Sequence, residues 1–196
     1  MMTPRRAMWL WIGILVAGMT GSFRDAMAAP QDTYAGEQAA LPVTFGYPAD
    51  WRLQEESGTI QPYEQVRLLG PRNHADTYTA YIALLGAAIG ELGQEARAEA
   101  WVSRLPDGAR VEARSTVTVD GLIASEVVMS QTIPSLHLHG QPPSPEIPVM
   151  TRALFFHAGV SQYEFIYSAD AREFASYAPI CDALLASLHV NRTEGP

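Results

Sequence analysis

The chain has 196 residues, 47% of them hydrophobic, and carries 13 lysine and arginine residues against 21 acidic residues. Its net charge of −8 makes nucleic acids and anionic membrane surfaces poor candidates for partners, because both carry negative charge themselves. The length suits one domain with a core that is stable unaided, and the single cysteine, Cys181, permits no intramolecular disulfide.

The N-terminus has the three parts of a secretory signal peptide. Arg5 and Arg6 give a positive start, an apolar run covers residues 8–21, and Ala26-Met27-Ala28 matches a cleavage site. The apolar run is shorter than the roughly 20 residues that a membrane-spanning helix needs. We therefore predict a signal peptide over residues 1–28, a flexible leader over residues 29–40, and a periplasmic or secreted product without stable membrane insertion.

Alternating apolar residues predict four strands in the first half of the chain, over residues 41–48, 51–54, 65–69 and 77–85. Residues 55–61 are predicted to form a loop. The apolar period then changes to three or four residues between positions 91 and 105, which predicts an amphipathic helix that ends before Pro106-Asp107-Gly108.

Two hairpins and a helix are predicted in the second half. Asp120-Gly121 separates strands over residues 111–119 and 122–133, and glycine there tolerates the positive φ of a tight turn. Strands over residues 149–157 and 160–167 form the second hairpin. The last helix ends at Leu188, with Asp170 and Glu173 as a capping box and Cys181 on its apolar face.

Between the hairpins, residues 134–148 hold five prolines and are predicted to form a long exposed loop. We expect this loop to bind a protein partner, because prolines restrict the free chain and so reduce the ordering entropy of docking. The predicted contact residues are Pro134, His137, His139, Pro142, Pro143, Pro145 and Pro148.

The same loop offers a possible metal site. His137 and His139 would point to one side of an extended segment, and Glu146 could join them as a third ligand. Since metal sites usually have three or four ligands, solvated histidines are the default interpretation. The sequence has no nucleophile elbow, no paired-cysteine motif and no phosphate-binding glycine loop, so we predict no cofactor and no catalytic residues.

Two segments carry a resemblance to a known family. They are Phe45-Gly46-Tyr47-Pro48-Ala49-Asp50-Trp51 near the start, and Tyr163-Glu164-Phe165-Ile166-Tyr167-Ser168 before the last helix. With the order of the predicted elements, they resemble the PsbP-like superfamily, which includes the extrinsic subunit P of photosystem II, a Ran-binding import factor and bacterial envelope proteins. The resemblance implies one α+β domain over residues 41–192. Its architecture would be an α/β/α sandwich whose central antiparallel sheet has about six strands flanked by helices.

Members of that superfamily mostly bind or stabilise proteins, and catalysis is not their common property. The resemblance therefore implies a non-catalytic exported protein that binds or helps to assemble a protein partner, and not an enzyme. One alternative is a periplasmic protein that binds a small ligand or a metal. An enzyme that uses dispersed residues is the third interpretation. Because fold analogy is weak evidence of function, these alternatives stay open.

Overall fold

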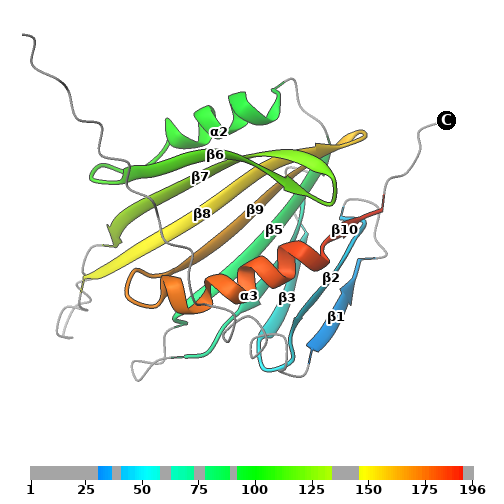
Figure 1. The fold of residues 1–196 in the computed structure, drawn as a ribbon, viewed down its shortest axis with the longest axis horizontal. Helices are drawn as coiled ribbons and strands as arrows, with labels where there is room; N and C mark the ends of the chain where they lie inside the picture. The colour runs from blue at the N-terminus through cyan, green and yellow to red at the C-terminus, as the bar shows by residue number, and fades with distance from the viewer. Residues whose placement is uncertain are drawn as a thin grey trace, which may run out of the picture.

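The computed structural model describes residues 31–36, 41–57, 63–72, 78–88, 92–133 and 146–191. Seven antiparallel strands in these ranges form the main sheet, in the order β3-β4-β5-β9-β8-β7-β6 (Figure 1). They are β3 (Arg52–Ser57), β4 (Tyr63–Leu69), β5 (Ala80–Ala88), β6 (Arg110–Val119), β7 (Leu122–Ile133), β8 (Ile147–Ala158) and β9 (Ser161–Asp170). Strands β3 and β6 are therefore the two edges of this sheet.

A smaller sheet has the order β1-β2-β10, with β1 (Gln31–Ala35), β2 (Val43–Pro48) and β10 (His189–Val190). Tyr34 of β1 stacks on Phe45 of β2, with ring centroids 5.0 Å apart. The prediction of a flexible leader over residues 29–40 is therefore wrong for residues 31–35, whose backbone pairs with β2. The predicted signal peptide, residues 1–28, lies outside the described residues.

The two helices of the described ranges lie on opposite faces of the main sheet (Figure 1). Helix α2 (Gln94–Val102) contacts β7 and β8, whereas α3 (Phe174–Ser187) contacts β9, β5 and β2. Because side chains alternate along a strand, Phe155 of β8 packs with α2, and Phe156 belongs to the larger core on the α3 side. The α+β class is confirmed, but the main sheet has seven strands rather than about six.

The hairpin predicted at Asp120-Gly121 is confirmed by β6 and β7. Both turn residues have positive φ, 49° at Asp120 and 74° at Gly121, as the tight turn requires. The Asp120 carboxylate also accepts a hydrogen bond of 2.9 Å from the backbone N–H of Val190. This turn therefore fastens the tip of the hairpin to β10 of the smaller sheet. Within the described residues, no helix is long and apolar enough to cross a membrane.

Two predicted loops are shorter than expected. Strand β3 continues to Ser57, and β8 begins at Ile147, inside the predicted proline-rich loop. Pro148 pairs with Thr132 of β7 but has no partner on β9, because β9 ends at Asp170, the partner of Val149. Proline lacks an N–H, so it is tolerated at a position where one side of the strand needs no ladder hydrogen bond.

The predicted capping box is wrong. Glu173 precedes α3 as its N-cap residue, but no side chain makes a capping hydrogen bond there. Asp170 instead accepts a hydrogen bond of 3.0 Å from the backbone N–H of Arg172, and its carboxylate also pairs with the Arg172 guanidinium. The start of α3 is therefore fixed by a local turn and by packing of its apolar side, which includes the buried Cys181 and Leu184.

Candidate functional site

Most of the residues predicted to bind a partner or a metal lie outside the residues that the structure describes. Pro134, His137, His139, Pro142, Pro143 and Pro145 lie outside the described residues. Glu146 and Pro148 are described, and both are exposed. Among the described residues, no three histidine, cysteine or acidic side chains come close enough to hold a metal ion.

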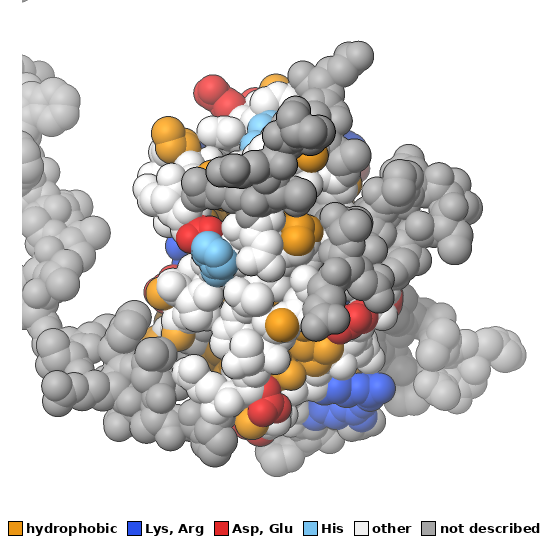
Figure 2. Space-filling model, turned by 90° about the vertical axis from the view of Figure 1, so that its right-hand side faces the viewer, with side chains coloured by type: hydrophobic (Ala, Val, Ile, Leu, Met, Phe, Trp, Pro, Cys, Tyr) orange, Lys and Arg blue, Asp and Glu red, His pale blue; other side chains and the backbone are white. Residues whose placement is uncertain are grey.

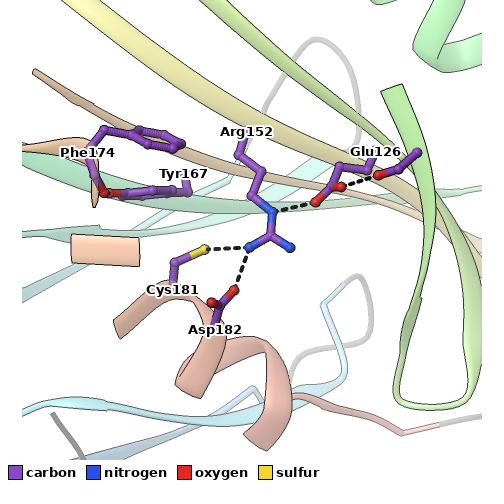
Figure 3. A network of polar contacts seen from close by, with 7 residues as sticks. Glu126, Arg152, Tyr167, Phe174, Cys181 and Asp182 are labelled. Carbon is purple, nitrogen blue, oxygen red and sulfur yellow. Dashed lines mark hydrogen bonds and ion pairs between the residues drawn. The ribbon is translucent and has the colours of Figure 1, made fainter. Parts of the chain in front are cut away.

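A buried ionic network lies instead on the α3 face of the main sheet (Figure 3). Arg152 of β8 donates from Nε to Glu126 of β7 at 2.5 Å, and from Nη1 to Asp182 of α3 at 2.6 Å. Glu126 also accepts a hydrogen bond from Ser115 on the edge strand β6. One guanidinium therefore joins two strands of the sheet to the helix that covers it.

The electrostatics of this network indicate a structural role. Burial alone would lower the pKa of Arg152, but the hydrogen bonds to Asp182 and Glu126 outweigh it, and the pKa is raised. Cys181, whose Sγ lies 3.9 Å from Arg152 Nη1, has a pKa raised to about 12, chiefly by burial. A thiol with that pKa stays protonated at neutral pH, so Cys181 is no nucleophile.

Two stacked aromatic residues, Tyr167 of β9 and Phe174 of α3, lie beside this network (Figure 3). The Tyr167 hydroxyl donates to the backbone carbonyl of Phe174 at 2.5 Å, and the two rings stack with centroids 4.7 Å apart. Burial raises the pKa of Tyr167, so the phenol remains a neutral donor. Its hydrogen bond is used to hold the first turn of α3.

A second charged cluster occupies the α2 face. Arg97 of α2 lies over the ring of Phe155, 5.7 Å from its centroid, and donates to the Tyr163 carbonyl at 3.2 Å. Its closest carboxylate, Glu164 of β9, is 3.7 Å away. Burial lowers the pKa of Arg97, and Glu164 offsets this only in part. The charge of Arg97 is therefore less fully compensated than that of Arg152.

Strand β6 is an edge of the main sheet and has β7 as its only neighbour among the described strands. Its first half is protected by a bulge between Val111 and Ala113 and by charged side chains, which both discourage pairing with another strand. The second half, residues 115–119, has regular register and no charge. At the opposite edge, β3 carries Arg52, Glu55 and Glu56 along six residues.

Grooves flank this uncharged half of β6 on both faces of the sheet. On the α3 face, a cavity of about 230 Å³ is lined by Val117, Val119 and Leu185, with Arg152 and Asp182 also in its wall. On the α2 face, a cavity of about 430 Å³ is lined by side chains that include Thr116 and Ile123, the latter 62% exposed. An added strand could thus place alternate side chains into two existing grooves.

Figure 2 views the end of the molecule at which the two hairpin turns lie. The hydrophobic side chains visible there form several small groups among polar ones rather than one broad patch. The described side chains visible in this view therefore do not form the large contiguous apolar surface that marks many protein interfaces.

Sequence reasoning missed the two arginine clusters, although a signal for them was present. Charged residues lie inside strands that are rich in apolar residues, at Arg152, Glu126 and Glu164. A charge in such a position is usually paired. Their partners could not be assigned, because Arg152 is separated from Glu126 by 26 residues and from Asp182 by 30. The pairing depends on strand order, which periodicity does not give.

Comparison with known proteins identifies the fold. No protein-family model and no curated protein matches the sequence. Cyanobacterial PsbP from Synechocystis sp. PCC 6803 is similar over 83% of this chain and 94% of its own, with 12% identity and a TM-score of 0.53. Protein PA94 from Pseudomonas aeruginosa is similar over 83% and 99%, with 12% identity and a TM-score of 0.51.

A protein from Bacteroides thetaiotaomicron is also similar, with 13% identity over 83% of this chain and a TM-score of 0.50. The chain spans about half of that protein, 49% of its length. At these identities the likeness is one of fold. The chain has the PsbP-like fold, as the resemblance in its sequence predicted.

Proposed function

We propose that this chain is an exported, non-catalytic accessory protein that binds an extended segment of a protein partner at the edge of β6. The signal-like N-terminal sequence supports export, and the PsbP-like fold is compatible with an accessory role. The observation that carries the proposal is the second half of β6, where an unprotected edge meets grooves on both faces of the sheet.

The partner segment would add to the main sheet as a further strand, about 4.8 Å from β6. Side chains on its α3 side would lie beside Val117 and Val119, and those on the other side beside Thr116 and Thr118. The first groove combines apolar side chains with Arg152 and Asp182, and the second is lined mainly by polar and charged side chains. We therefore expect a partner segment of about five or six residues that alternates apolar and small polar side chains.

The proline-rich segment is proposed as a second contact with the same partner. It joins Ile133 to Ile147, which pair with each other at the end of the sheet where β6 begins. This end of the sheet is opposite to residues 115–119, so the segment would contact a different part of the partner from the docked strand. Val111 and Ile133, both partly exposed apolar residues at this end, could extend the contact.

The test is retention of a partner from envelope extracts by the wild-type protein and two single variants. Thr116→Lys puts a charge on the open half of β6, as natural edge strands do to prevent pairing. Thr33→Lys is the matched control, since it makes the same substitution at an exposed position of β1, the edge of the smaller sheet. Both variants should melt within a few degrees of the wild type, since surface substitutions usually change stability by less than about 0.5 kcal/mol.

We expect Thr116→Lys to weaken retention about tenfold, which corresponds to 1.4 kcal/mol, and Thr33→Lys to leave it unchanged. A partner that Thr116→Lys retains as well as the wild type would contradict the β6 edge as the binding site. A wild-type protein that retains no specific partner would contradict the protein-binding function itself.

A further inference from the structure

The α2 face holds a cavity of about 290 Å³ that belongs neither to the β6 edge nor to the Arg152 network. It is lined by Leu92, Arg97 and Ala100 from α2 and its approach, by Arg104 beyond the helix, and by Phe155 and Glu164 from the sheet. Small-ligand pockets typically have volumes of about 300–1,000 Å³. At about 290 Å³ this cavity lies just below the lower end of that range, so it suits only a small, compact ligand.

The charged groups of this cavity favour an anion. Two guanidinium groups, those of Arg97 and Arg104, face it with one carboxylate, that of Glu164. Burial raises the pKa of Glu164, although both arginines act to lower it. The closest contact between Arg97 and Glu164 is 3.7 Å, longer than a charge-assisted hydrogen bond of about 2.7–2.9 Å. One negative charge from a ligand would balance the second arginine.

The uncharged part of the wall favours an apolar body. Phe155 presents a ring beneath Arg97 and is itself only 1% exposed. Leu92, which is 50% exposed, and Ala100 line the cavity from the other side. Gln162 is the one uncharged polar residue among the described residues of the wall. An aliphatic or aromatic group placed against Phe155, Leu92 and Ala100 would be removed from water.

A buried polar atom near Arg97 has no hydrogen-bond partner. His157 follows Phe155 on the same face of β8, and its Nε2 atom makes no hydrogen bond. Burial lowers the pKa of His157, with a contribution from the nearby Arg97, so the ring is mainly neutral at pH 7. Buried polar groups normally have hydrogen-bond partners, and this one lies on the same face of β8 as Phe155 of the cavity wall.

We propose that this cavity binds a small monocarboxylic acid with an apolar body. The carboxylate lies between Arg97 and Arg104, and the body lies against Phe155 and Leu92. A liquid-water molecule takes about 30 Å³, so the cavity has room for about ten waters, enough for an acid of benzoate size. This ligand site is independent of the β6 edge, because it lies on the opposite side of α2 from the groove that Thr116 lines.

The probes are benzoate and its neutral isostere benzamide, measured by titration calorimetry at low ionic strength with the purified protein. We expect benzoate to bind at least about tenfold more tightly than benzamide, because a charge-assisted hydrogen bond contributes about 1.5–3 kcal/mol. Acetate, which has the charge but no apolar body, should also bind more weakly than benzoate. Equal affinities for benzoate and benzamide, or no measurable benzoate binding, would overturn the proposal.

Two variants separate the site from general charge effects. Arg104 is exposed, so Arg104→Gln should fold normally and weaken benzoate binding about fivefold or more, while Arg104→Lys should restore part of the affinity. Arg172→Gln is the control, because it removes the same charge from the turn before α3, where the side chain is 77% exposed. An equal loss in Arg104→Gln and Arg172→Gln would show attraction by the overall charge and would overturn the proposed site.

Discussion

Arg97 and Arg152 are half-buried arginines that lie on opposite faces of one sheet and differ in how their charge is balanced. Arg152 has carboxylates at 2.5 and 2.6 Å, and its pKa is raised despite burial. Arg97 has one carboxylate at 3.7 Å, and its pKa is lowered by burial. Burial removes both guanidinium groups from water. The number and distance of the carboxylates therefore decide whether the pKa of each arginine is raised or lowered.

This comparison separates a structural ionic group from one that is available to a ligand. The Arg152 network has two acids for one base, and its hydrogen bonds run between β7, β8 and α3, so it fastens elements together. The Arg97 cluster has two bases for one acid and borders a cavity. An arginine inside an apolar strand or helix is therefore better judged by its partners than by its burial.

The largest effect is expected from Arg152→Met, which removes the only base of the Arg152 network. Glu126 and Asp182 would then face each other across the interface of sheet and helix without a counter-charge. Breaking a buried ion pair costs about 3–5 kcal/mol, and we expect about 3 because Asp182 is 45% exposed. Urea denaturation measures this, and a loss below about 1 kcal/mol would contradict the structural role of Arg152.

A smaller effect is expected from Arg97→Met. This variant loses the hydrogen bond to the Tyr163 carbonyl and one long ion pair, but the methionine chain can still cover Phe155. A single hydrogen bond contributes about 1 kcal/mol, so we expect a loss of about that size and no more. If Arg97→Met destabilises the protein as much as Arg152→Met in the same urea titration, the distinction between the two arginines is wrong.

The smallest expected effect is the pH dependence that His157, which lies near Arg97, contributes to the stability of the folded protein. Its folded pKa is lowered below the ordinary value of about 6.5, so the unfolded chain takes up the proton first as the pH falls. Its neutral ring therefore supports the folded state above pH 6.5, and this support is lost as the pH falls through the folded pKa.

Melting temperatures of the wild type and of His157→Gln between pH 8 and pH 5 test this contribution. The wild type should lose more stability below about pH 6.5 than the variant does, because only the wild type has this titrating group. Parallel curves for the two proteins would show that His157 titrates alike in both states and that its burial has no electrostatic consequence.

Local signals in the sequence predicted the hairpins and the last helix, because each depends on residues close together in the chain. Asp120-Gly121 is such a case, since the turn needs only a backbone that adopts positive φ. Strand β1 was missed because its polar residues show no alternation, and its place depends on pairing with β2 and on the contact of Tyr34 with Phe45. The capping box failed because the Asp170 carboxylate pairs with Arg172 instead.

The candidate sites were harder to predict than the elements. The sequence drew attention to the histidines of the proline-rich segment, whereas the ionic clusters and the open edge depend on strand order. Nothing in residues 115–119 identifies them as an edge until β6 is placed at the end of the sheet. A short, uncharged strand has the same sequence pattern at the edge of a sheet as in its interior.

Amide hydrogen exchange, measured with and without the partner, shows whether the partner docks on the second half of β6. Outward-facing N–H groups of residues 115–119 have no strand to pair with among those described, so they should exchange quickly in the free protein and slow down at least about tenfold in the complex. Unchanged exchange at residues 115–119, with new protection at β3 or β1 instead, would contradict the claim.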